Sequence, residues 1–79
     1  MSIDTVAAAI GRVMRTEAPA VSEATRLVED LGMDSSAVFG LLFELEDTLA
    51  IQVDTDTLQP RDLATVGAVA DLVEKCRQP

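Results

Sequence analysis

Ser35 is the residue of this sequence whose type and position best allow covalent chemistry. It follows Asp34 at the end of the stretch Leu-Gly-Met-Asp-Ser, residues 31–35, where a loop containing Gly32 gives way to an apolar helical pattern. A serine in the first turn of a helix presents its hydroxyl beside backbone N–H groups that lack a partner within the helix. An anion attached to that oxygen would be stabilised by the helix dipole by about 0.3–1 kcal/mol. The alternative is that Asp34 and Ser35 only cap the helix, which is the commoner role of such residues.

Few other residues offer catalytic or metal-binding chemistry. Histidine is absent, which removes Ser–His, Cys–His and His-ligated metal arrangements. Asp54 and Asp56 begin like a calcium-binding loop, but Leu58 replaces the third ligand and the match fails. Cys76 falls on the apolar side of the last predicted helix, where a cysteine acts as a small core residue. We therefore expect no catalytic residues, no metal site and no enzymatic activity.

Charge is distributed unevenly along the chain. Residues 27–60 hold eight acidic side chains and no lysine or arginine, whereas the rest of the chain has six acids and six bases. The simplest interpretation of such a run is a solvated face. Because unrelieved repulsion is a cost in so small a domain, a docking surface for basic partner proteins explains the pattern better. The residues assigned to this surface are Glu44, Glu46, Asp47, Asp54 and Asp56.

Length and composition predict one small helical domain over residues 1–79. Apolar residues make up 48% of the chain and Phe39 and Phe43 are its only aromatics, which favours aliphatic helix packing over a sandwich or barrel. The net charge of −8 argues against nucleic acid as a direct ligand. Cys76 has no partner for an internal disulfide, and no uncharged run is long enough for a signal peptide or a membrane span. We expect a cytoplasmic monomer with no membrane partner.

Hydrophobic periodicity predicts an all-α bundle with four segments. The first helix begins at Ile3, is capped by Ser2 and ends before Pro19. Residues 17–33 form a long loop, which is uncommon in a compact domain unless it has a function.

The second helix begins at Asp34 or Ser35 and runs to about Ala50, with an inward stripe of Val38, Leu41, Leu42, Leu45 and Leu49. Pro60 allows only a short helical piece after it, and Thr65 caps a last helix. The buried side of that last helix is expected to contain Val66, Val69, Ala70, Val73 and Cys76.

The sequence resembles the acyl carrier protein family over nearly its whole length. The stretch Leu-Gly-Met-Asp-Ser at residues 31–35 is similar to the family's attachment motif, Leu-Gly-x-Asp-Ser. Val28-Glu29-Asp30 precedes the motif, and a leucine-rich segment with Glu44, Glu46 and Asp47 follows it. Near the end, Leu63-Ala64-Thr65-Val66 resembles the start of the family's last helix.

This resemblance implies a four-helix bundle with a long first loop and a short third helix. It also implies that Ser35 carries 4′-phosphopantetheine as a phosphodiester, installed by a phosphopantetheinyl transferase that uses coenzyme A. The thiol of that group would hold an acyl cargo as a thioester and present it to acyl-loading and acyl-processing enzymes with basic docking surfaces. The protein would then be a covalent shuttle that catalyses nothing itself.

Departures from the family pattern bear on the pathway and on the modified serine. Carrier proteins of fatty acid synthesis often have acids where this chain has Ala37 and Gly40, and an apolar residue where it has Ser36. Asp34 and the spacing from Gly32 favour Ser35 over Ser36 as the attachment residue. The departures favour a specialised pathway, such as polyketide synthesis, over housekeeping fatty acid synthesis. The alternatives are an aminoacyl or peptidyl carrier of nonribosomal peptide synthesis and an unmodified helical adaptor.

Phe39 and Phe43 lie one helical turn apart and are displaced from the inward stripe of the second helix. Ordinary core packing is the simplest account of both rings. Carrier proteins that resemble this chain often have smaller residues at these two positions, beside the groove that receives an acyl chain. Because two bulky rings at the margin of such a groove would narrow it, we expect a long saturated chain to be poorly sequestered.

Overall fold

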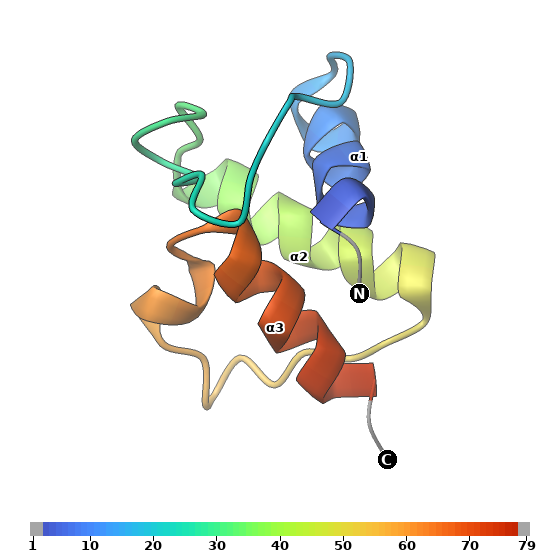
Figure 1. Ribbon diagram of the computed structural model, residues 1–79. Helices are drawn as coiled ribbons and strands as arrows, with labels where there is room; N and C mark the ends of the chain where they lie inside the picture. The colour runs from blue at the N-terminus through green and yellow to red at the C-terminus, as the bar shows by residue number, and fades with distance from the viewer. Residues whose placement is uncertain (1–2, 78–79) are drawn as a thin grey trace.

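The computed structural model describes residues 3–77, and the regular elements in this range are helices, with no strand among them. Three α-helices, α1 (Ile3–Met14), α2 (Ser35–Leu49) and α3 (Val66–Arg77), are joined by a long loop and by the short helix η1 (Pro60–Leu63) (Figure 1). The all-α class is confirmed. The expected four-helix bundle is not, because the third helix is a single 3₁₀ turn of four residues that begins at a proline. None of the helices in residues 3–77 is both long and apolar enough to cross a membrane.

Helices α1 and α2 form where the sequence predicts them. Helix α1 buries Val6, Ala9 and Ile10, while its expected cap, Ser2, lies outside the described residues. Helix α2 begins directly after Asp34 and ends at Leu49, and the capping residue Ala50 that follows adopts the left-handed conformation with φ 54°. The inward stripe of α2 is buried at Val38, Leu41, Leu42 and Leu45 and half-buried at Leu49.

Helix α3 is capped by Thr65, as the sequence predicts, because the Thr65 hydroxyl oxygen accepts a hydrogen bond from the Ala68 N–H at 3.0 Å. Val66, Val69, Ala70 and Val73 are buried. Cys76 is only half-buried, so the prediction of a core cysteine is wrong in degree. Cys76 lies in the last turn of α3, one turn after Val73, which is the last buried residue of that helix.

The long loop between α1 and α2 is held to the start of α3 by main-chain hydrogen bonds. The Leu27 N–H donates to the Ala64 carbonyl at 3.1 Å, and the Val66 N–H donates to the Thr25 carbonyl at 2.9 Å. A third bond joins the Gly67 N–H to the Glu23 carbonyl at 2.9 Å. In Figure 1 the loop descends from the end of α1 to the start of α3 and then turns back to α2. The loop therefore forms one wall of the space beside the start of α2.

One apolar core joins the three α-helices and the loop. Leu27 and Met33 of the loop are buried in it, which fixes the path of the chain into Asp34. The residues that form this core are Val6, Ala9, Ile10, Leu27, Met33, Val38, Leu41, Leu45, Val66, Val69, Ala70 and Val73.

Candidate functional site

Asp34 and Ser35 have separate roles at the start of α2. Asp34 has an extended backbone, and its Oδ1 accepts a hydrogen bond from the Ala37 N–H at 2.8 Å. Asp34 therefore supplies the side-chain cap of α2, a role that the sequence allowed for both Asp34 and Ser35. Ser35 is the first residue of the helix and is exposed, so its hydroxyl is accessible at the positive end of the helix dipole.

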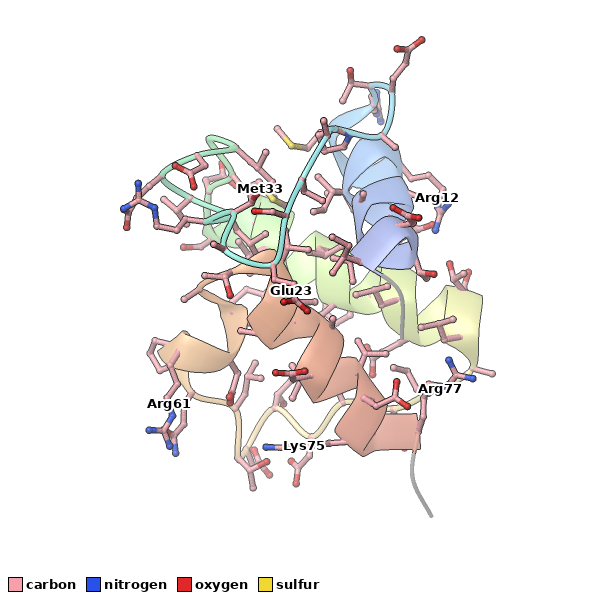
Figure 2. All side chains as sticks on the ribbon, viewed as in Figure 1. Arg12, Glu23, Met33, Arg61, Lys75 and Arg77 are labelled. Carbon is pink, nitrogen blue, oxygen red and sulfur yellow. The ribbon has the colours of Figure 1, made fainter. Side chains whose placement is uncertain are left out.

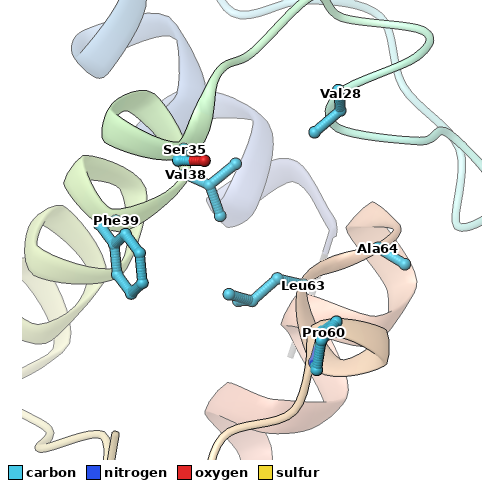
Figure 3. Close-up of a pocket in the computed structure, with 7 residues that line it drawn as sticks. All are labelled: Val28, Ser35, Val38, Phe39, Pro60, Leu63 and Ala64. Carbon is cyan, nitrogen blue, oxygen red and sulfur yellow. The ribbon is translucent and has the colours of Figure 1, made fainter.

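An apolar cavity of about 370 Å³ opens beside Ser35. Figure 3 shows Ser35, Val38 and Phe39 on α2 facing Leu63 and Pro60 of η1, with Val28 of the loop on the remaining side. The residues that line the cavity are Val28, Ser35, Val38, Phe39, Pro60, Leu63 and Ala64. Ser36 is exposed but does not line it, so the two neighbouring serines differ in surroundings.

The loop wall of the cavity is ordered by a local network around Arg26. The Arg26 N–H donates to Asp30 Oδ2 at 2.8 Å, and the Arg26 guanidinium pairs with Asp30 and with Glu29. The hydrogen bond from the Arg26 main chain, followed by that from its side chain, lowers the pKa of the Asp30 carboxyl. Gly32, with φ 69°, then turns the chain toward Asp34 in a conformation that favours glycine. Val28 lies within this ordered turn, at the rim of the cavity.

The two phenylalanines are exposed, which excludes ordinary core packing. Phe39 is 45% exposed and lines the cavity. Phe43 is 62% exposed and does not line it. The structure therefore places only Phe39 at the margin of the cavity beside Ser35.

Three of the five carboxylates assigned to docking are used within the chain. Glu44 forms an ion pair with Arg12 of α1, which also bonds to Thr48. Glu46 Oε2 accepts a hydrogen bond from the Val53 N–H at 3.0 Å. Asp54 Oδ1 accepts one from the Asp56 N–H at 3.0 Å. Asp47 and Asp56 are exposed.

Comparison with known protein families gave a match over most of the chain. A family model described as a phosphopantetheine attachment site matches residues 4–73. The chain belongs to this family. It is a carrier protein of the acyl carrier family, whose members hold a covalently attached 4′-phosphopantetheine prosthetic group. A search of curated proteins gave no match.

The start of α2 fits such a prosthetic group. Carrier proteins of this family need an accessible hydroxyl for a phosphodiester, and Ser35 presents one at the first position of a helix. The adjoining cavity is lined mainly by apolar side chains. Sequence reasoning did not identify Val28 and Pro60 as cavity residues. They come from a loop and a 3₁₀ turn, where hydrophobic periodicity carries no signal.

Proposed function

We propose that this carrier protein holds acyl intermediates as thioesters on a 4′-phosphopantetheine arm attached to Ser35 Oγ and presents them to partner biosynthetic enzymes. The observation that carries the proposal is the position of Ser35. Its side chain combines exposure at the start of α2 with a place in the wall of the apolar cavity. Ser36 is exposed but does not line that cavity.

In the attachment reaction, the Ser35 oxygen is the nucleophile and attacks coenzyme A, which is bound to the transferase. The new bond joins Ser35 Oγ to the phosphorus that bears pantetheine. The phosphoanhydride bond of coenzyme A breaks, adenosine 3′,5′-bisphosphate leaves, and the hydroxyl proton passes to a base on the transferase. Once bound, the group supplies a thiol on a flexible arm, which raises the effective concentration of a tethered cargo at each partner enzyme. The start of α2 stabilises the phosphodiester anion by about 0.3–1 kcal/mol.

We further propose that the pathway is a specialised one, such as polyketide synthesis, and that the protein acts as a monomer in the cytoplasm. Ala37 and Gly40 support the specialised pathway, because they stand where carriers of fatty acid synthesis often have acidic residues. The second candidate is an aminoacyl or peptidyl carrier of nonribosomal peptide synthesis, which shares the fold and the attachment serine.

The attachment is tested by measuring the intact mass of the purified protein after incubation with coenzyme A and a broad-specificity phosphopantetheinyl transferase. We expect the mass to increase by one phosphopantetheine unit, and fragmentation to place the increase on Ser35. No increase in mass would contradict the proposed carrier function and favour the unmodified adaptor. An increase located on Ser36 would contradict the assignment of the attachment residue.

We expect short cargo to be accommodated better than a long saturated chain. The cavity of about 370 Å³ lies near the lower end of the range for ligand pockets, roughly 300–1,000 Å³. Val38 lines this cavity and belongs to the same buried apolar core as Leu41 and Leu45. Enlarging the cavity into this core would disturb close packing, which costs about 1–3 kcal/mol.

This expectation is checked by loading the arm with acyl groups of increasing length and recording amide chemical shifts and melting temperature. Shifts confined to the residues around Ser35, with a constant melting temperature, are expected. Shifts that spread to Leu45 and Val69 with each added carbon, together with a rising melting temperature, would show deep burial and contradict the prediction.

A further inference from the structure

The connection from α2 to η1, residues 50–59, forms no regular element and is mostly exposed. In residues 46–65, all of which lie in the described part of the chain, Val53 is the only buried side chain. At the far end of the connection, Pro60 and Leu63 of η1 line the cavity beside Ser35. The group that holds Val53 therefore also holds the start of the path to this wall of the cavity.

Glu46 holds Val53 and the end of α2 through two different oxygen atoms. Its Oε2 accepts a hydrogen bond from the Val53 N–H at 3.0 Å, and the Glu46 side chain is half-buried. Its main-chain carbonyl accepts from the N–H groups of Ala50 and Ile51. Ala50 has φ 54° and ψ 44°, a left-handed conformation that is unfavourable for a residue with a Cβ. The bonds to Glu46 therefore sustain a turn that the local sequence disfavours.

Two further carboxylates order the rest of the connection by accepting from main-chain donors. Asp54 Oδ1 accepts from the Asp56 N–H at 3.0 Å. Asp62 Oδ2 accepts from the Gln59 N–H at 2.9 Å, and the Gln59 carbonyl accepts from the Asp62 N–H at 2.9 Å. Hydrogen bonds to ionised acceptors are stronger than those between neutral groups. Local hydrogen bonds thus restrain the chain at two places between Val53 and the end of η1.

Helix η1 presents different side chains to the cavity and to solvent. Pro60 and Leu63 are three residues apart, so they lie on the same side of a 3₁₀ helix, and both line the cavity. Arg61 is exposed, and in Figure 2 its side chain extends away from the rest of the molecule. A rotation or shift of η1 would therefore change which side chains lie opposite Ser35.

We propose that Glu46 is a positioning residue for the cavity, because its hydrogen bond to Val53 fixes the path of the connection and thereby the place of η1. The restraints after Val53 pass a shift of that residue on to η1. An acceptor oxygen at the right reach performs this role, and negative charge is not required. This separates it from the docking role that the charge pattern predicts for Glu46. The inference goes beyond the proposed function, since it holds for any group that Ser35 carries.

Three substitutions of Glu46 in the unmodified protein separate the acceptor, its reach and its charge. Glu46→Ala removes all three. Glu46→Asp keeps the charge but shortens the side chain by one methylene, and Glu46→Gln keeps an acceptor oxygen at the same reach without the charge. Two measurements are made by NMR on each protein. Hydrogen exchange reports the protection of the Val53 amide, and residual dipolar couplings report the orientation of η1 relative to α2 and α3.

Glu46→Ala and Glu46→Asp are each expected to lower the protection of the Val53 amide by about tenfold and to change the couplings of η1. Glu46→Gln is expected to keep both close to wild type, because its amide oxygen can still accept from Val53. The matched control is Asp47→Ala, which removes the neighbouring exposed carboxylate of α2 and should change neither measurement. The orientation of η1 is decisive, since a bond that only stabilises the end of α2 would leave it unchanged.

Wild-type couplings of η1 in Glu46→Asp, whether or not the protection of Val53 falls, would overturn the proposal and limit Glu46 to a local bond. If Glu46→Gln changed the couplings while Glu46→Asp did not, charge would be the decisive property and the proposal would also fail. These measurements do not involve attachment at Ser35. Their failure would therefore leave the proposed carrier function intact.

Discussion

Replacing Ser35 by alanine is expected to abolish modification by phosphopantetheine completely, because the substitution removes the only oxygen that can form the phosphodiester at that position. The variant should fold normally. Asp34 supplies the side-chain cap of α2, and the exposed Ser35 side chain contributes little packing. Intact mass after incubation with coenzyme A and transferase is the measurement, and urea unfolding should give a free energy within about 0.5 kcal/mol of the wild type.

Ser36→Ala is the matched control for this prediction. It removes a hydroxyl from the next residue, which is also exposed but does not line the cavity. We expect the Ser36→Ala protein to gain one phosphopantetheine unit at a rate close to that of wild type. A variant Ser35→Ala that still gains the unit, or a variant Ser36→Ala that does not, would move the attachment to Ser36.

Gly67→Ala is expected to lower the free energy of unfolding by about 1–3 kcal/mol, although alanine is the better helix former. Gly67 lies at the second position of α3, where a Cβ would come within 2.9 Å of the Glu23 carbonyl oxygen and 3.0 Å of the Glu23 Cβ. To avoid this contact, the loop must move away from α3. The hydrogen bond from the Gly67 N–H to the Glu23 carbonyl would be stretched as a result.

Gly40→Ala provides the matched comparison, since it makes the same change in the middle of α2. There the nearest atom to an added Cβ is a methyl group of Val13 at 3.4 Å, an ordinary contact. We expect this variant to be more stable than wild type by up to about 1 kcal/mol. Urea unfolding of both variants checks the pair. A Gly67→Ala protein that is as stable as wild type, or as stable as the Gly40→Ala protein, would show that the approach of the loop to α3 is looser than the structure describes.

The parts of the fold that sequence predicts are those governed by local rules. Asp34 and Thr65 are good N-cap residues, and both cap helices through side-chain oxygens. The spacing of Val38, Leu41, Leu42 and Leu45 predicts the buried side of α2 because the period of a helix is fixed. Ser35 was selected by the same local argument together with the family motif, and its role as the attachment residue stays a prediction.

The parts that sequence reasoning missed depend on contacts between distant residues. Nothing near Glu44 or Glu46 in the chain indicates that Arg12 and the Val53 N–H engage them, because these pairs form only when α1 and the chain after α2 pack in place. The cavity could not be predicted for the same reason, since its walls come from three segments that only the fold brings together. Phe39 and Phe43 could be placed off the inward stripe by periodicity, but their degree of exposure depends on what the neighbouring loops cover.

The loop wall of the cavity beside Ser35 is held in place by main-chain groups, whereas its inner surface is formed by side chains. The loop is joined to the start of α3 by main-chain donors and acceptors, at Leu27, Thr25 and Glu23 on one side and Ala64, Val66 and Gly67 on the other. The inner surface consists instead of side chains such as Val28 and Leu63, which take no part in those bonds. Because a main-chain hydrogen bond can form with most side chains at the same position, the residues that line the cavity can be substituted without removing these bonds. Val28→Ala or Leu63→Ala is expected to enlarge this cavity while the main-chain hydrogen bonds around it are kept, so the volume beside Ser35 can be changed one residue at a time.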